Sequence, residues 1–313
     1  MEYLNDLKAI LHSKRANIYY LEKCRVMVKD GRVMYLTETK NEYKYWNIPI
    51  ANTTVILLGM GTSITQAAVR MLASAGVMIG FSGTEGTPLI AGTDIEWLTP
   101  QSEYRPTEYV QGWMRFWFDD EKRLDAAKRF QKERINYLSK TWSNDALLSD
   151  NQFYPDDIEI SSGLKTFMKR FDEANTVNDL LANEAALTKT LYKYAANRTD
   201  FSGFTREREA TDKANTFLNH GNYLAYGLAA SVLWVLGIPH GFAVMHGKTR
   251  RGALVFDVAD LIKDAIILPL SFICAKQNFS EQDFRTQCIQ GFVKHKAMDF
   301  MFNVTKDVAL KTA

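Results

Sequence analysis

The feature that most constrains the fold is a change of hydrophobic pattern near residue 100 of the 313-residue chain. Up to about residue 91, short runs of alternating apolar and polar residues are separated by turn residues, as expected for half-buried β-strands. Beyond residue 109 the apolar residues recur every three to four positions over long stretches, which is the period of an amphipathic helix. The sequence therefore predicts an α+β protein with a β-rich N-terminal domain, residues 1–100, and an all-α domain, residues 101–313.

The N-terminal strands are delimited by their own turn signals. The segment CRVMVKDGRVMYLTE predicts a hairpin that turns at Asp30-Gly31, because this dipeptide tolerates the left-handed backbone of a tight turn. YKYWNIPI, TTVILLG and VMIGFSG are predicted as further strands. The segment 92–109, which contains two prolines and mixed polarity, is predicted as the linker between the domains.

A glycine-rich stretch in the same domain, VILLGMGTSITQAAVRMLASAG, has the order strand, Gly-x-Gly, helix that begins a dinucleotide site. Ile64 stands where the third glycine is required, and the next strand does not end in the acid that binds the ribose. We therefore predict a strand-to-helix turn capped by Thr62 or Ser63, and no residues that bind an organic cofactor.

The composition indicates the cellular compartment of the protein but says little about its function. Because 38 basic and 36 acidic residues nearly cancel, any nucleic-acid surface must be a local patch. Three scattered cysteines without a CxxC pair indicate a reducing compartment. The first residues include acids and are not a secretory signal, and the longest apolar stretch, residues 228–245, is interrupted by Gly237 and Pro239. We expect a cytoplasmic protein without a membrane span.

The segment TVNDLLANEAALTKTLYKYAA predicts a helix with Glu184 on its apolar stripe, three and four residues after Leu181 and Leu180. A carboxylate that faces a core is costly unless it is paired, hydrogen-bonded or bound to a metal. Alternatively, Glu184 lies at the edge of the stripe and pairs with an arginine. Periodicity does not decide between these two interpretations.

A second group of polar residues lies in VMHGKTRRGALVFDVADLIKD, residues 244–264. Gly247 and Gly252 allow the chain to reverse, so that a helix starting near Ala253 returns beside His246. This helix carries three aspartates at i, i+3 and i+7, and the loop before it carries three cations. These residues are Asp257, Asp260 and Asp264 on the helix, and Lys248, Arg250 and Arg251 in the loop.

One imidazole and several carboxylates form a ligand set suited to Mg²⁺ or Mn²⁺, and the absence of a zinc motif makes Zn²⁺ a poorer fit. A basic loop beside such a site indicates a polyanionic substrate and phosphodiester chemistry. Alternatively, the loop is a solvated surface and the aspartates are a charge cluster at a helix N-terminus. The residues alone leave both interpretations open.

The residues around Glu184, the segment 212–247 and LVFDVADLIKD resemble the CRISPR-associated integrase, the nuclease subunit of spacer acquisition. The segments LHSKRANIYYLEKCRVMV and YWNIPIANTTVILLGMGTSITQAAVRMLASAGV fit the same family, so that the resemblance covers nearly the whole chain. The detailed match is to the branch that accompanies type I-F systems.

The resemblance implies a β-sandwich-like N-terminal domain that forms a homodimer, followed by an α-helical catalytic domain. It implies that Glu184, His246 and Asp260 are the catalytic metal ligands for Mg²⁺ or Mn²⁺, with Asp257 as a second acid near the site. It further implies a partner, a small ferredoxin-like adaptation subunit that in this branch is fused to a helicase-nuclease. Double-stranded DNA is the implied substrate, both as spacer precursor and as repeat array.

The implied activity is insertion of captured foreign DNA as new spacers, by attack of a 3′-hydroxyl on a phosphodiester of the repeat. Lys248, Arg250 and Arg251 then become candidate DNA contacts. Two alternatives remain: a metal-dependent nuclease that cleaves branched DNA without integration, and a DNA-binding scaffold that the metal only stabilises. The remaining candidates are Arg198, Arg206 and Arg208, as phosphate contacts or plain surface, and His220 and His240, as structural histidines.

Overall fold

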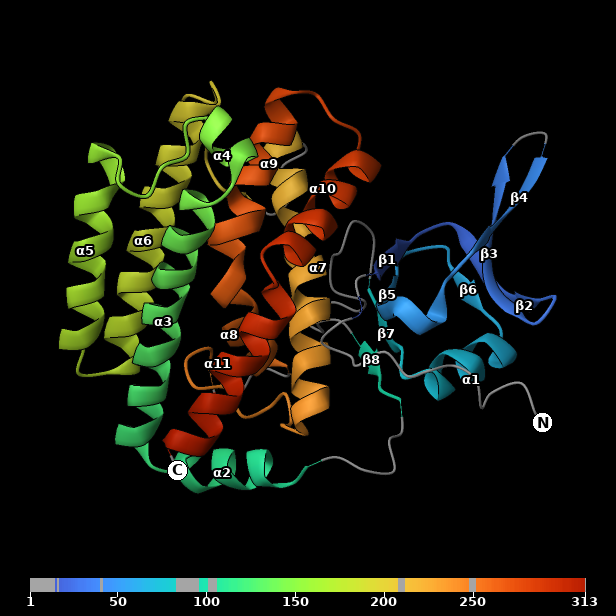
Figure 1. Cartoon of the computed structure of the whole chain (residues 1–313), viewed down its shortest axis with the longest axis horizontal. Helices are drawn as coiled ribbons and strands as arrows, with labels where there is room; N and C mark the ends of the chain where they lie inside the picture. The colour runs from blue at the N-terminus through green and yellow to red at the C-terminus, as the bar shows by residue number, and fades with distance from the viewer. Residues whose placement is uncertain are drawn as a thin grey trace. The chain divides into compact units, whose positions relative to one another are not determined.

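The computed structural model describes residues 15, 17–39, 42–82, 96–100, 106–207, 212–247 and 252–312. It divides into two compact units, residues 1–105 and 106–313, so that the boundary lies five residues after the predicted one. Strands occupy the first unit and long helices the second (Figure 1), which confirms the predicted α+β class.

The N-terminal unit contains two four-stranded sheets. The first has the order β1-β5-β7-β8, with parallel β1/β5 and β5/β7 pairs and an antiparallel β8 at its edge. The second has the order β4-β3-β2-β6. The strands are β1 Asn17–Leu21, β2 Cys24–Lys29, β3 Arg32–Thr39, β4 Glu42–Asn47, β5 Thr53–Leu58, β6 Ser63–Ile64, β7 Met78–Phe81 and β8 Glu96–Leu98.

Side chains from both sheets bury one shared core. Val26 and Val33 contribute from the second sheet and Ile56 from the first, all almost fully buried. The predicted hairpin is confirmed, since β2 pairs antiparallel with β3 across Asp30 and Gly31, both at positive φ. Parallel pairing of β1 with β5 was not evident from the sequence, because periodicity indicates which face is buried but not which strand lies alongside.

The glycine-rich stretch forms a strand-to-helix connection, as predicted, but its cap differs. Helix α1, Gln66–Ser74, is capped by Thr65, whose hydroxyl accepts a hydrogen bond from the amide of Ala68 at 3.3 Å. The predicted cap was wrong by two or three residues because Ser63 lies in β6 and Thr62 donates to the carbonyl of Leu21.

The predicted linker 92–109 is not wholly a linker. Residues Glu96–Leu98 form β8, which pairs with β7, and Glu108 begins α2. Polar composition concealed this strand because an antiparallel edge strand is buried on one face at most.

In the described residues of the second unit, all regular secondary structure is helical. None of these helices is both long enough and apolar enough to cross a membrane. The helices are α2 Glu108–Trp117, α3 Asp120–Ser143, α4 Ala146–Asp150, α5 Ile158–Glu173, α6 Val177–Arg198, α7 Lys213–Leu236, α8 Ala253–Ile262, α9 Leu268–Lys276, α10 Glu281–Lys294 and α11 Ala297–Lys311.

Helices α8 and α9 are joined without a loop by a π-helical turn, η4 Lys263–Ile267. Two neighbouring helices leave room for this wider turn by presenting glycine. A Cβ at Gly221 of α7 would lie 2.4 Å from Ile267, and one at Gly291 of α10 would lie 2.9 Å from Ile266. Single π-turns of this kind are frequent at functional sites, and this one begins three residues after Asp260.

Candidate active site

The site is built around the loop between α7 and α8, which carries His246. Helix α8 begins at Ala253, as predicted, and its Asp257 is almost completely buried against this loop. Oδ2 of Asp257 accepts from the amides of Val244, at 2.8 Å, and Met245, at 3.1 Å. Oδ1 accepts from the His246 amide at 3.1 Å and lies 2.6 Å from Nδ1 of the same residue.

Four donors thus saturate the carboxylate of Asp257, which leaves it little capacity to bind a metal directly. Its position instead fixes the ring of His246, because a hydrogen bond to Nδ1 leaves Nε2 as the coordinating atom. The predicted second acid is therefore near the site, but its contacts are those of a residue that orients the imidazole.

Asp260 lies one helical turn further along α8 and faces the other ring nitrogen. Its Oδ2 is 3.8 Å from Nε2 of His246, and its Oδ1 forms an ion pair with Lys263 of η4. The Lys263 ammonium also lies 5.4 Å from the centre of the Tyr226 ring, a cation–π contact. His246 and Asp260 are therefore brought together as the sequence predicted.

Glu184 projects from α6 and forms an ion pair with Arg134 of α3. Nη1 of Arg134 donates to Oε1 of Glu184 at 2.9 Å, and Nε donates to Oδ2 of Asp264 at 2.5 Å. Nη2 donates to Thr188 at 3.0 Å. The guanidinium, only 3 % exposed, thus joins α3, α6 and η4, and Glu184 has the arginine partner that one of the two sequence interpretations expected.

The charged groups of this network alter one another's proton affinity. Burial alone would lower the pKa of His246, but the hydrogen bond to Asp257 and the nearby Asp260 charge outweigh it and raise the pKa. Burial alone would raise the pKa of Asp260. The positive charges of Lys263, His246 and Arg134 outweigh this effect, so that the pKa of Asp260 is lowered. The pKa of Asp264 is raised because its burial exceeds the effect of Arg134.

Helix capping explains why Glu184 falls at this position. Thr176 caps α6 through a reciprocal pair of hydrogen bonds with Asp179, which fixes the start of the helix. From this start, Leu180, Leu187 and Leu191 form the buried stripe, and Glu184 lies on its edge with a side chain that is 18 % exposed.

The donor set fits a hard or borderline divalent cation, with one imidazole nitrogen whose partner nitrogen is already bound to a carboxylate. Within the described part of the chain, however, no group of three or more His, Cys, Asp or Glu side chains is arranged to hold a metal ion. Arg134 and Lys263 each engage one oxygen of Glu184 and Asp260, respectively. The predicted ligands therefore fall into two groups, His246 with Asp260 and Glu184 with Arg134, and the charge of Arg134 acts on Asp260. They are not arranged as a preformed metal site.

Arg134 and Lys263 are the site residues that sequence reasoning missed. Arg134 lies in a helix that carries several other cations, so that its sequence neighbours do not distinguish it. Lys263, three residues after Asp260, could have been recognised as an i, i+3 partner.

The other predicted candidates lie elsewhere or outside the described residues. Lys248, Arg250, Arg251 and Arg208 fall outside the described residues. Arg198 forms ion pairs with Asp157 and Glu159, and Arg206 donates to Asn215 and Asn219. His220 is buried with Nδ1 3.8 Å from Glu281, and burial lowers the pKa of His240 to about 4.

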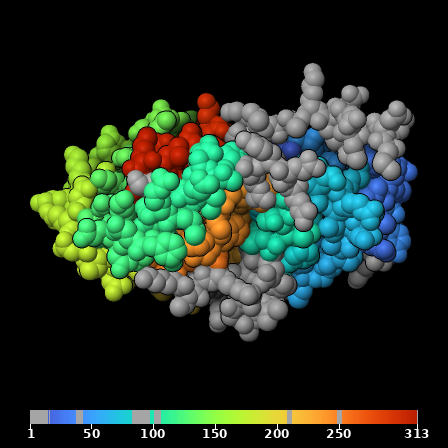
Figure 2. Space-filling view, turned by 90° about the horizontal axis from the view of Figure 1, so that it is seen from below, coloured from blue at the N-terminus to red at the C-terminus, as the bar shows by residue number. Residues whose placement is uncertain are grey.

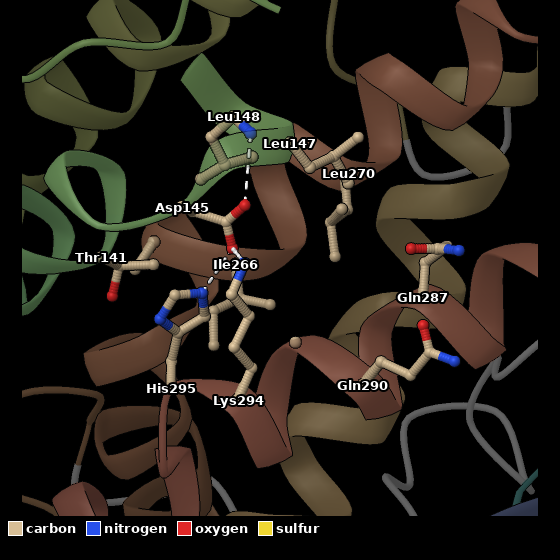
Figure 3. A pocket seen from close by; sticks show the side chains of 12 residues that line it. Thr141, Asp145, Leu147, Leu148, Ile266, Leu270, Gln287, Gln290, Lys294 and His295 are labelled. Carbon is tan, nitrogen blue, oxygen red and sulfur yellow. Dashed lines mark hydrogen bonds and ion pairs between the residues drawn. The ribbon is translucent and has the colours of Figure 1, made fainter. Parts of the chain in front are cut away.

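A cavity of about 240 Å³ lies in the same unit, but none of the predicted site residues lines it. Figure 3 shows leucine side chains on one side and Gln287 and Gln290 on another, with dashed lines from Asp145 to both His295 and Lys294. Oδ2 of Asp145 is 2.6 Å from Nε2 of His295 and 3.0 Å from Nζ of Lys294. Because these polar groups already satisfy one another, we place the chemistry at the His246 network.

Comparison with known proteins identifies the family of the chain. The family model described as CRISPR associated protein Cas1 matches residues 18–303. A CRISPR-associated endonuclease Cas1 from Pectobacterium atrosepticum is 55% identical over 313 residues, with 98% of this chain and 96% of the relative covered. One from Pseudomonas aeruginosa is 53% identical over 314 residues, covering 98% and 97%.

Solved structures share the fold at low sequence identity. A Cas1 protein from Thermotoga maritima has a TM-score of 0.71 at 17% identity, covering 93% of this chain and 96% of its own. A casposase bound to an integration product has a TM-score of 0.71 at 14% identity, covering 94% and 91%. With a family model that spans most of its length and relatives more than half identical, this chain belongs to the Cas1 family of CRISPR-associated proteins.

Proposed function

We propose that the protein is a DNA endonuclease and integrase that requires Mg²⁺ or Mn²⁺ and inserts captured DNA fragments as spacers into a CRISPR repeat array. Relatives that are more than half identical carry the name endonuclease, and a protein of the same fold has been solved with an integration product. The reaction would be attack of a fragment's 3′-hydroxyl on a phosphodiester, which displaces one strand end.

The observation that carries this proposal is the His246–Asp257 pair. A buried carboxylate that accepts the Nδ1 proton is the usual outer partner of a metal-binding histidine, and it directs Nε2 towards Asp260. Glu184 would provide a further carboxylate through Oε2, since its described hydrogen bonds involve Oε1. A divalent ion held by these three residues would polarise the phosphate and stabilise the charge that develops on it.

The chain's own cations would share this task. Lys263 and Arg134 both lower the pKa of the buried Asp260 carboxyl, because each places a positive charge near it. Lys263 is partly exposed, at 21 % of its side chain, whereas Arg134 is not. We therefore assign phosphate contact to Lys263 and a purely internal role to Arg134.

The test is a strand-transfer assay with labelled fragment and repeat DNA, with Mg²⁺, with Mn²⁺ and with EDTA. The proposal expects joined product with either ion and none with EDTA. Released fragments without joined product would favour the nuclease of branched DNA. A metal-stabilised scaffold would yield no product and would lose most of its thermal stability in EDTA, whereas the proposed enzyme should lose mainly activity.

We further propose that the protein forms a homodimer through its N-terminal unit. In the second sheet, the face opposite the core carries Met27, Met34 and Leu36, all partly exposed, beside Tyr45 at 41% exposure and Tyr43 at 65%. Lys29 covers the Tyr45 ring at 3.6 Å. An apolar patch of this kind on a sheet with an open edge strand is typical of a protein–protein interface. Light scattering at micromolar concentration should give twice the mass of the 35.7 kDa chain, and a monomer would contradict the proposal.

The proposed partner is a small ferredoxin-like adaptation subunit, fused to a helicase-nuclease. Family membership supports this proposal, and no described surface is assigned to the partner. Co-purification of the two proteins from the same genome, followed by size-exclusion chromatography of the mixture, tests it. Separate elution at micromolar concentrations of both would contradict it.

A further inference from the structure

The loop that carries His246 is held by side chains on both sides of its backbone. The indole N–H of Trp113 donates to the carbonyl of Phe242 at 3.0 Å, and that of Trp117 donates to the carbonyl of Ala243 at 2.7 Å. The next three amides, those of residues 244–246, donate to Asp257. Five consecutive residues thus each have one backbone group bound to a side chain from another element.

Helix α2 is built to present these two indoles together. Trp113 and Trp117 are four residues apart and therefore lie on the same face of the helix. Trp113 is fully buried, and the ring of Trp117 meets that of Phe242 edge-on at 4.9 Å. The end of α2 is secured by Arg123, whose Nη1 donates to the carbonyl of Trp117 at 3.2 Å. Figure 2 shows α2 and α3, in green, with α11, in red, beside them on this face.

We infer that Trp117 and Trp113 are positioning residues for His246, and that they help to set the distance between its Nε2 atom and Asp260. This inference rests on the proposed function, since it concerns the proposed metal ligand. A loop bound only to Asp257 could pivot about that one carboxylate. Two hydrogen bonds to the preceding carbonyls remove this freedom, because they hold the same backbone from α2 while Asp257 holds it from α8.

We expect the loss of these hydrogen bonds to weaken metal binding more than it slows the chemical step. A ligand that must be ordered when the ion binds lowers affinity by the entropy of that ordering, whereas a preorganised ligand does not. Loss of a residue that orients a metal ligand typically weakens metal binding by about 10- to 100-fold. Trp117 does not bind the His246 ring but holds the backbone of Ala243 before it. Its loss should therefore weaken metal binding less, by about three- to tenfold.

The decisive variant is Trp117→Phe, which retains an aromatic ring and removes the single N–H donor. Trp113→Phe is the second variant and should act in the same direction. The matched control is Tyr137→Phe in the same unit, which removes a hydrogen bond of 3.1 Å from a largely buried ring to the carbonyl of His295. All three variants lose one donor to a backbone carbonyl, but only the tryptophan variants release the His246 loop.

Three measurements on the full-length protein test the inference. Hydrogen exchange without metal should be faster for the amides of residues 244–246 in Trp117→Phe than in wild type or Tyr137→Phe. Isothermal titration with Mn²⁺ should give a dissociation constant about three- to tenfold higher for Trp117→Phe and unchanged for Tyr137→Phe. At saturating Mn²⁺, strand transfer by Trp117→Phe should return to within about twofold of wild type.

The inference is overturned if exchange in the loop is unchanged, or if Trp117→Phe and Tyr137→Phe weaken Mn²⁺ binding equally, which would indicate a general loss of stability. Persistent inactivity of Trp117→Phe at saturating Mn²⁺ would also overturn it. Wild-type protein that neither binds Mn²⁺ nor depends on it would overturn the proposed function and this inference together. Wild-type binding without a difference between the variants rejects the inference alone.

Discussion

Nδ1 of His246 lies 2.6 Å from Oδ1 of Asp257, while the amide of the same histidine donates to the same oxygen. One carboxylate thus determines both where the backbone of the histidine lies and which ring nitrogen faces Asp260. The consequences of this arrangement, and of the neighbouring arginine, are measurable.

Asp257→Asn should reduce both stability and activity. The asparagine amide presents an NH₂ group to donors that the carboxylate accepted, so that at least one buried amide loses its partner at a cost of about 1–3 kcal/mol. Strand transfer should fall by about 10- to 100-fold, as expected when the partner of a metal-binding histidine is lost. Urea unfolding and the transfer assay measure the two effects. A variant with wild-type values for both would contradict the described geometry.

Arg134→Met should be among the most destabilising substitutions in the helical unit. It leaves the buried Asp264 and the adjacent Glu184 without their shared cation, for which a loss of about 3–5 kcal/mol is expected. The control is Arg129→Met on the same helix, whose ion pair with Asp307 is 31 % and 33 % exposed and should contribute less than about 1 kcal/mol. Equal losses in urea unfolding would show that Arg134 is not buried as described.

Glu184→Ala and His246→Ala should each abolish metal-dependent joining and leave most of the fold intact. Because the two residues would act on one ion, the double variant should be little worse than either single variant. The transfer assay with Mg²⁺ and Mn²⁺ measures activity, and circular dichroism checks the fold. Near wild-type joining by either single variant would reject the ligand assignment, and strictly additive losses would reject a shared ion.

Asp145→Asn tests electrostatics away from the His246 network and provides a control for Asp257→Asn. Burial alone would raise the pKa of Asp145, but hydrogen bonds from His295, Lys294 and the Leu148 amide outweigh it and lower the pKa. A lowered carboxyl pKa adds stability above the unfolded value, about 3.9, and this stability is lost as the pH falls through the lower folded value. Urea unfolding should therefore show destabilisation near neutral pH that diminishes below about pH 4. Strand transfer at neutral pH should be unaffected.

Arg250→Ala and Arg251→Ala test the predicted DNA contacts in the loop after His246. Each lost phosphate contact should flatten the plot of log affinity against log salt by about 0.9 on duplex DNA, about equally for all sequences. Lys169→Ala is the control, because its side chain is 76 % exposed and lies on α5. An unaltered slope with a reduced melting temperature would indicate internal ion pairs and reject DNA contact.

The sequence by itself determined the order and type of the main elements. Alternation at Cys24–Lys29 and Arg32–Thr39, with Asp30-Gly31 between them, was sufficient for the hairpin, because turn chemistry and side-chain period are local properties. The start of α8 at Ala253 was predicted for the same reason, since Gly252 at φ +73° ends the preceding loop. The helix that carries Glu184 likewise followed from local periodicity.

Only the tertiary structure decided what these residues contact. Arg134 meets Glu184 across 50 positions and Asp264 across 130, and Trp117 meets Ala243 across 126. Periodicity identifies the face that a helix buries, but many arrangements of the neighbouring helices satisfy the same pattern. The π-turn at Lys263–Ile267 depends on Gly221 and Gly291, in helices on either side of it in the sequence. Close packing between segments that are far apart in the sequence determines these contacts. Local sequence preferences carry no information about that packing.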